Sequence, residues 1–199
     1  ELINGDLTLS GSTIDLNGHK LTVNGNLYQT GGMMNINGGK LEIEGNYTID
    51  RDWECKAILQ MTNDSDYIRV AGNFFTKAYY DHTKYLTAGV LEVKGNFTQR
   101  VNGAGASFNA SGTHKVILSG DTLQEVNFSH PQYSGFNIIE IKNTEGKEVK
   151  FTSSISLNRL ITNECKITSL VFLHRNWVLT GDELINGDLT LSGSTIDLN

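Results

Sequence analysis

Acidic residues between positions 50 and 66 are the first candidates for chemistry, because carboxylates can hold a cation. Asn63-Asp-Ser-Asp66 resembles the opening of a calcium loop, but it lacks the ligand spacing and the closing Glu of an EF-hand. We interpret it as a solvated turn. Asp50, Asp52 and Glu54 alternate, which would place three carboxylates on one face of a strand. No second motif supports a cation there, and the sequence predicts no metal site.

The histidines and the common catalytic motifs give no site either. No histidine lies three or four residues from another, and none accompanies a cysteine cluster. The sequence contains neither a Gly-x-Ser-x-Gly elbow nor a Gly-rich phosphate loop. We therefore predict no catalytic, cofactor-binding or metal-binding residues. The histidines are His19, His82, His114, His130 and His174.

Aromatic residues in polar segments are the remaining candidates for ligand contact. Trp53, Tyr79, Tyr80 and Tyr133 lie in such segments, and their rings could stack on sugars. The alternative is that they cover the bases of loops. They are the residues that we expect to contact a surface glycan, if the protein binds one.

Composition and charge exclude two classes of partner. The formal net charge of −6 argues against nucleic acid, because phosphate binding needs clustered Lys and Arg. No apolar run approaches the ~20 residues of a membrane span. The chain has 21 glycines and one proline among 199 residues, which is too ordered a composition for a linker and too rich in glycine for a helical bundle.

The elements that must position these side chains repeat at two scales. Residues 1–17 and 183–199 are identical, so the sequence holds one complete unit, 1–182, and the start of the next, 183–199. Within the unit, Gly5, Gly25 and Gly45 recur at a constant step, and the next equivalent glycine, Gly72, follows after a longer one. A period of ~20 residues indicates stacked supersecondary units.

Each 20-residue step reads as three short strands. Apolar residues alternate, as at Leu7 and Leu9 or at Leu21 and Val23, and Gly- and Asn-rich turns separate the runs. We predict an all-β fold, a parallel β-helix (β-solenoid) with about eight coils of 20–27 residues per 182-residue unit. Asn-Gly between apolar runs is also a hairpin signal, so an antiparallel sandwich or meander is the alternative. Hairpins do not explain why the whole pattern repeats in phase.

Stacking makes specific predictions about contacts. Like residues should lie over one another, for example Leu7 on Leu27 on Tyr47. Asn17 over Asn37, and the Asn that follows Gly in each coil, could form amide ladders; the alternative is that Asn and Gly merely suit left-handed turns. Neither end shows a polar cap, so we expect the ends to continue into further coils or to stack on neighbouring molecules.

The cysteines and the enzyme hypothesis are judged against this fold. Cys55 and Cys165 would be five coils, or roughly 24 Å, apart at ~4.8 Å per coil, whereas a disulfide needs Cα atoms ~4.4–6.8 Å apart. We expect buried free thiols, with bridging between chains as the alternative. β-Helices include pectin-cleaving enzymes, but these need clustered Asp with Arg or Lys on one face. Here Asp mainly follows Gly at turns, as at Asp6, so we predict that the protein is not an enzyme.

Four segments between residues 21 and 143 carry the repeat most clearly: LTVNGNLYQTGGMMNINGGKLEIEGNY, LEVKGNFTQ, ASGTHKVILSGDTLQEVNF and FNIIEIKN. These segments resemble the repeat regions of large secreted surface proteins of Gram-positive bacteria, clostridia and bacilli in particular. The resemblance implies an extracellular, tandemly repeated stalk or adhesin at the cell surface.

We therefore expect a structural segment of an extracellular fibre, whose partner is itself, end to end. A carbohydrate- or surface-binding adhesin module is the alternative, and a polysaccharide-degrading enzyme is third.

Overall fold

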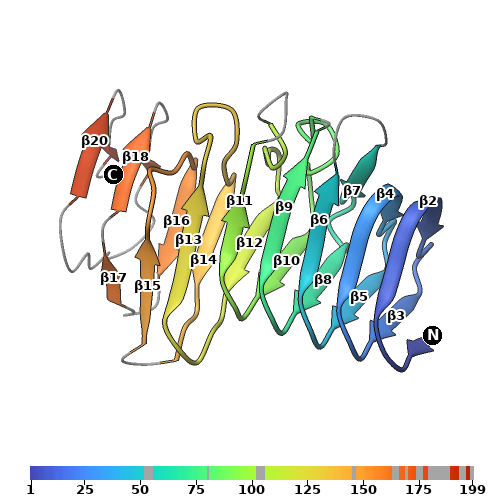
Figure 1. Ribbon diagram of the computed structural model, residues 1–199. Helices are drawn as coiled ribbons and strands as arrows, with labels where there is room; N and C mark the ends of the chain where they lie inside the picture. Colours follow the sequence, from blue (N-terminus) through green and yellow to red (C-terminus); the bar gives the residue numbers. More distant parts are fainter. Residues whose placement is uncertain are drawn as a thin grey trace.

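The computed structural model is a parallel β-solenoid, a chain that winds repeatedly around one axis (Figure 1). It describes residues 1–51, 56–79, 81–101, 106–144, 147–162, 166–168, 170–173, 177–178, 189–192 and 196–197. Every strand pairing is parallel, and about six full turns are well formed. Within the described residues there is no helix, and thus none that is long and apolar enough to cross a membrane.

Two long sheets form two sides of the solenoid. The first sheet contains, in spatial order, β1 (Leu2–Ile3), β3 (Lys20–Val23), β5 (Lys40–Ile43), β8 (Tyr67–Val70), β10 (Val90–Val93), β12 (Lys115–Leu118), β14 (Ile138–Ile141) and β16 (Arg159–Thr162). The second contains β2 (Leu7–Asp15), β4 (Leu27–Asn35), β6 (Tyr47–Arg51), β9 (Phe74–Ala78), β11 (Phe97–Gln99), β13 (Gln124–Phe128), β15 (Glu148–Phe151) and β17 (Lys166–Thr168).

The third side is less regular than the three-strand pattern predicts. The second halves of β2 and β4 cover it in the first two turns, and β7 (Ala57–Gln60) pairs with β4 in the third. In the next turns the described residues form single parallel bridges there, Met61 to Leu86 and Asn109 to Gly135. Inserted residues that the structure describes, such as 81–85 and 129–134, directly precede the bridge residues Leu86 and Gly135 and interrupt the ladder on this side.

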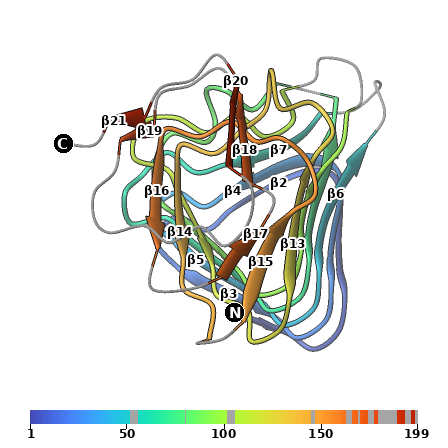
Figure 2. The same cartoon turned by 90° about the vertical axis from the view of Figure 1, so that its left-hand side faces the viewer.

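The period-two alternation places apolar side chains inside and polar side chains outside. Leu21 and Val23 are buried and stack on Leu41 and Ile43 of the next turn. The interior is one continuous hydrophobic core from Leu9 to Ile167. A turn alone would leave its apolar side open to water, so each turn is stabilised by its neighbours. In the view turned by 90°, successive turns superimpose around this core (Figure 2).

Most predicted stacks are confirmed, with one shift. Leu7, Leu27 and Tyr47 lie in register, as expected. The repeat also predicts that Ile161-Thr-Asn163 lies over Ile141-Lys-Asn143, and this is wrong by one position, because Ile141 pairs with Thr162 and Ile161 pairs with Glu140. The sequence predicts eight coils within positions 1–182, and the last of these fall where only short strands are described. Those strands are β18 (Leu170–Leu173), β19 (Trp177–Val178), β20 (Leu189–Ser192) and β21 (Ile196–Asp197).

Candidate binding surfaces

A ladder of asparagine side chains runs along one corner of the solenoid. The Oδ1 atom of Asn26 accepts hydrogen bonds from the backbone N–H of Asn46 at 2.9 Å and from its side-chain amide at 3.0 Å. Asn46 accepts in the same way from the backbone of Asn73, and Asn73 from that of Asn96. None of these residues has a positive φ. The amide-ladder interpretation is therefore right here, and the left-handed-turn alternative is wrong.

Asn17 and Asn37 show the opposite outcome. Both have left-handed φ values, 45° and 46°, and they begin a tight turn before glycine. The side-chain amide of Asn37 donates to Asp15 at 3.0 Å. At this position asparagine is used because it tolerates a left-handed backbone better than most residues.

A column of glycines beside the ladder explains why the Gly-Asn dipeptide recurs in the sequence. A Cβ atom on Gly72 would lie 2.6 Å from Asn46 Oδ1 and 2.7 Å from the carbonyl oxygen of Gly45. The backbone N–H of each glycine donates to the glycine carbonyl of the preceding turn, at 2.9 Å for Gly72 to Gly45. Turns approach so closely at this corner that no side chain fits between them.

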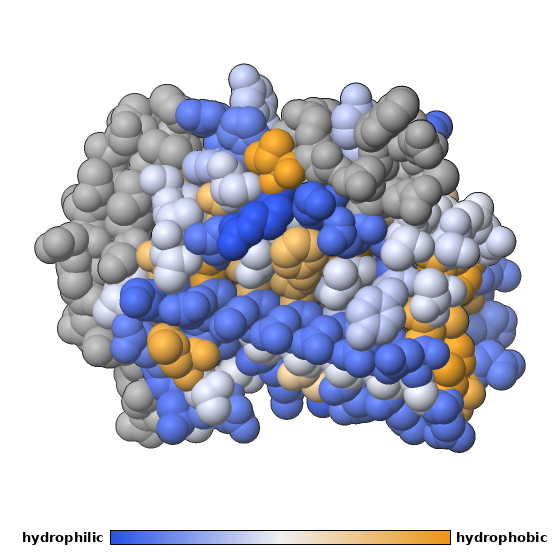
Figure 3. Space-filling view, viewed as in Figure 1, coloured by the Kyte–Doolittle hydropathy of each residue, from blue (hydrophilic) through white to orange (hydrophobic). Residues whose placement is uncertain are grey.

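A shallow groove of about 390 Å³ lies on the outer face of the second sheet. Its floor is a column of outward-facing residues in register, Tyr28, Thr48, Phe75 and Thr98. The asparagine ladder forms one wall. Figure 3 shows this face, where hydrophilic residues form a band across the strands. Aromatic rings alternating with hydroxyls and amides give a surface that can stack on sugar rings and hydrogen bond their hydroxyls.

The outer face of the first sheet is charged instead. Glu42 lies between the Lys20 and Lys40 ammonium groups, at 2.7 and 2.8 Å. Hydrogen bonds from these two lysines hold the pKa of the Glu42 carboxyl below its usual value. Such pairing of opposite charges along a surface column adds little stability per pair, about 0–1 kcal/mol.

Two of the described histidines lie inside the solenoid. His114 is fully buried, and neither of its ring nitrogens has a hydrogen-bond partner among the described residues. Burial lowers the pKa of His114 to about 3. His82 is also buried, with Nδ1 2.5 Å from the Ser107 carbonyl oxygen and Nε2 3.1 Å from that of Ala57. Burial lowers the pKa of His82 as well, although both carbonyl contacts act in the other direction.

The segment Asn63-Asp-Ser-Asp66 is not a solvated turn throughout. Asp66 is only 1% exposed. Its carboxylate accepts hydrogen bonds from the backbone N–H groups of Gly38, Thr62 and Asn63, at 2.5, 2.7 and 3.0 Å. The carboxylate therefore closes its own turn and ties it to the preceding turn of the solenoid. No group of three possible metal ligands occurs within the described residues.

The predicted loop aromatics do not form one site. Tyr79 and Tyr133 are 37% and 58% exposed, and they follow β9 and β13, which are two places apart in the second sheet. The ring of Tyr133 packs edge-on against His130. Trp53 and Tyr80 lie outside the described residues, as do Cys55 and Cys165, so the thiol prediction stays a prediction. The groove formed by Tyr28 and Phe75 was missed because their outward alternation with Thr is visible only once the register is known.

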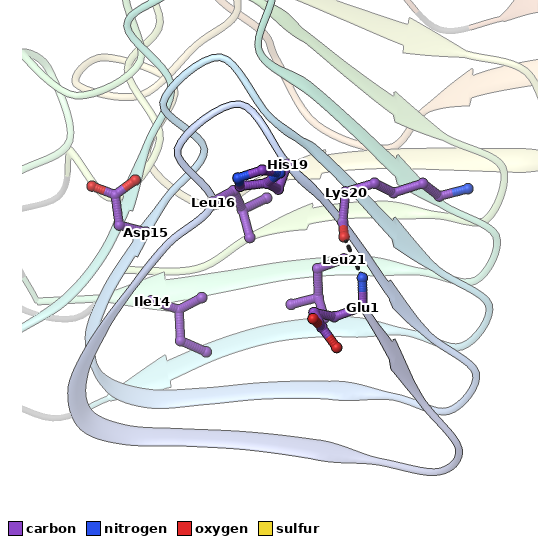
Figure 4. Close-up of a pocket in the computed structure, with 7 residues that line it drawn as sticks. All are labelled: Glu1, Ile14, Asp15, Leu16, His19, Lys20 and Leu21. Carbon is purple, nitrogen blue, oxygen red and sulfur yellow. Dashed lines mark hydrogen bonds between the residues drawn. The ribbon is translucent and has the colours of Figure 1, made fainter.

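The first turn leaves a hollow of about 520 Å³ at its outer side (Figure 4). Ile14, Leu16 and Leu21 point into it, whereas Asp15 points away. The N-terminal ammonium group of Glu1 donates to the Lys20 carbonyl oxygen at 2.8 Å and closes the turn. β1 and β2 are the last strands in their sheets.

Comparisons with known proteins add no family. No family model matches the chain, and no curated protein or solved structure matches it significantly. The class that the observations define is thus the parallel β-solenoid. The resemblance to surface proteins of Gram-positive bacteria stays a prediction.

Proposed function

We propose that the protein is a structural segment of an extracellular bacterial fibre or stalk, built from β-solenoid units that continue one another end to end. The proposal is supported by the way in which the described strands of the second copy of residues 1–17 pair with the turn before them. The strands β20 and β21 of this copy lie parallel to β18 and β19 of the turn before it. A following unit that begins in this way would extend the same ladder.

Three features of the described residues support a load-bearing role over a catalytic one. The core is continuous along the axis, and the asparagine ladder joins turn to turn. The buried carboxylate of Asp66 is occupied by backbone N–H groups. The extracellular placement rests on the family resemblance.

A tandem chain tests the proposal. Residues 1–182 followed by the full chain should give a single straight rod, longer by ~4.8 Å for each added turn and unchanged in cross-section. Small-angle scattering measures both quantities. The matched control carries Leu189→Asp and Leu191→Asp at the junction, which should let the two halves bend relative to each other. Two independently tumbling halves in the unsubstituted tandem chain would contradict the proposal.

A carbohydrate-binding adhesin module is the second candidate, because of the groove on the second sheet. Tyr28 and Phe75 are two strands apart in one column, or about 10 Å. Two rings at this spacing can stack on separate sugars of one chain, while Thr48 and the asparagine ladder offer hydrogen bonds between them.

Binding to a glycan array distinguishes the groove from the loops. The double variant Tyr28→Ala, Phe75→Ala should no longer bind any glycan that the unsubstituted protein binds on the array. Tyr133→Ala, which removes an exposed ring outside the groove, is the matched control and should leave binding unchanged. If Tyr133→Ala loses binding and the groove variant keeps it, the loops bind the glycan. If the unsubstituted protein binds no glycan on the array, this candidate function is wrong.

A further inference from the structure

The fold fixes the spacing of the two aromatic rings in the groove on the second sheet. Tyr28 on β4, Thr48 on β6 and Phe75 on β9 are partners across three neighbouring parallel strands. Thr98 on β11 follows Phe75 in the same register. All four side chains line the groove, so the column alternates ring, hydroxyl, ring, hydroxyl. Because neighbouring strands lie ~4.8 Å apart, the two rings are about 10 Å apart along the solenoid axis.

The asparagine wall of the groove has hydrogen-bond donors that the ladder does not use. Asn46 donates its side-chain amide to Asn26 at 3.0 Å. Asn73 and Asn96 use Oδ1 instead, which accepts from the backbone N–H of the following turn. No group among the described residues accepts a hydrogen bond from the Nδ2 atom of Asn73 or Asn96, and both residues line the groove. Two amide donors are thus available to a ligand here.

The groove is uncharged, unlike the outer face of the first sheet. The next outward-facing residues along β6 and β9, Asp50 and Lys77, pair with each other at 3.4 Å. The net charge of −6 also disfavours a polyanion. An uncharged ligand therefore complements this surface. The lining residues, none of which is ionised at neutral pH, are Tyr28, Asn46, Thr48, Asn73, Phe74, Phe75, Asn96 and Thr98.

A flat polysaccharide ribbon matches the spacing of the rings. In an extended β-1,4-linked chain each sugar is turned over relative to the one before, so every second sugar presents the same face. The advance per sugar is close to the strand spacing of ~4.8 Å. Two sugars separated by a third can therefore stack on Tyr28 and Phe75 at once, while the sugar between them lies over Thr48. An α-1,4-linked chain coils and leaves a straight column after one ring.

The amide donors select one kind of ribbon. In a chain of N-acetylglucosamine, the acetamido groups of every second sugar project from the same edge. When those sugars lie on the rings, this edge can face the wall, where Asn73 and Asn96 donate to acetamido carbonyl oxygens. We propose that the groove binds an uncharged chain of β-1,4-linked N-acetylglucosamine along the solenoid axis, with alternate sugars on Tyr28 and Phe75. The inference rests on the second candidate function and adds the linkage, the sugar and the direction of the ligand.

The length of the ligand gives the first test. A disaccharide can reach one ring only, whereas a trisaccharide is the shortest ligand that reaches both. Isothermal titration calorimetry on the full chain, with the two oligosaccharides of β-1,4-linked N-acetylglucosamine, should show about ten-fold tighter binding of the trisaccharide. A trisaccharide that binds no tighter than the disaccharide would overturn the inference.

An exchange of two residues tests the spacing itself. The double variant Thr48→Phe, Phe75→Thr keeps two rings in the column but places them on neighbouring strands, where consecutive sugars present opposite faces. It should lose the advantage of the trisaccharide, and Tyr133→Ala, outside the groove, should keep it. An exchanged variant that keeps the advantage would contradict the inference. If the exchanged variant does not fold by circular dichroism, Tyr28→Ala replaces it and should bind both oligosaccharides equally.

Two further trisaccharides test the linkage and the sugar. An α-1,4-linked glucose trisaccharide should not bind, and a β-1,4-linked one should bind more weakly than the N-acetylglucosamine trisaccharide because it lacks acetamido groups. Equal or tighter binding of either would overturn the inference. If the glycan array identifies a different glycan that needs Tyr28 and Phe75, the carbohydrate-binding candidate stands and this inference fails. If the array identifies none, both fail.

Discussion

The first turns and the middle turns of the solenoid fill their cores with different side chains. From Leu7 to Ile43 the turns are short and equal in length, and the core consists mainly of Leu, Ile, Val and Met. From Phe74 to Phe136 the turns are longer and rings fill the core: Phe97 contacts four other phenylalanines. The asparagine ladder runs through the first turns and into the middle region, where its last member, Asn96, accepts from the backbone N–H of Glu125. Turn length thus varies from 20 to 27 residues along the asparagine ladder, and aromatic side chains fill the core of the longer turns.

The largest effect is expected where the aromatic core is most connected. Phe97→Ala removes a ring whose centroid lies 4.9–5.5 Å from those of Phe74, Phe108, Phe128 and Phe136. It should lower the free energy of unfolding by about 3–5 kcal/mol. Leu21→Ala in the first turns is the comparison, and it should cost less because Leu21 keeps 8% exposure near the end. Urea unfolding measures both; equal losses would show that the two cores are equally tight.

The next effect tests the corner that both regions share. Gly72→Ala forces a Cβ atom to within 2.6 Å of Asn46 Oδ1, and we expect a loss of about 1–3 kcal/mol. Gly11→Ala is the control, because a Cβ atom there would meet nothing within 4 Å. Thermal unfolding should separate the two variants clearly. A tolerated Gly72→Ala would mean that the turns can move apart.

Burial of His114 in the middle turns should also make the stability of the protein depend on pH. The pKa of His114 is about 6.5 in the unfolded chain, and burial lowers it to about 3 in the folded chain. Its contribution to stability is complete above pH 6.5 and falls by about 1.4 kcal/mol per pH unit as the pH drops toward 3. His114→Leu should make the slope in this window shallower, while buried His82 still contributes to it, and should leave stability at pH 7 unchanged or higher. His19→Leu, at an exposed position of the first turn, is the matched control.

The smallest effect concerns a single rung of the ladder. Asn73→Ala removes the acceptor of the Asn96 N–H and should cost about 0.5–1.5 kcal/mol. Asn73→Asp keeps an acceptor oxygen at the same place, as Asp6 does for Asn26 at 2.7 Å, and should cost less. Chemical denaturation resolves the difference. Equal losses for both variants would mean that the rung depends on the amide and not on its oxygen.

Much of the fold could be predicted from the sequence, because stacked turns require similar residues at regular intervals. Gly25 and Gly45 recur at one step because neighbouring turns touch there, and Leu21 and Leu41 recur because one lies over the other. The role of Asp66 could not be predicted, because its partner Gly38 is 28 residues away on another turn. The groove was equally hidden, since Tyr28 and Phe75 come together only through the register of a long turn. Periodicity predicts which residues of successive turns stack on one another. It does not predict which distant residues an inserted segment contacts.

The direction of the hydrogen bonds has a mechanical consequence. The bonds that join Gly25 to Gly5 and Gly45 to Gly25 link one turn to the next, so they point along the axis. All turns therefore carry the same tension when the two ends are pulled, and the outermost turn, which has a neighbour on one side only, yields first. Each released turn of 20 to 27 residues supplies about 70–90 Å of extended chain in exchange for ~4.8 Å of rod. A stalk built in this way would lengthen in discrete steps under load, which single-molecule stretching would record as a regular sawtooth.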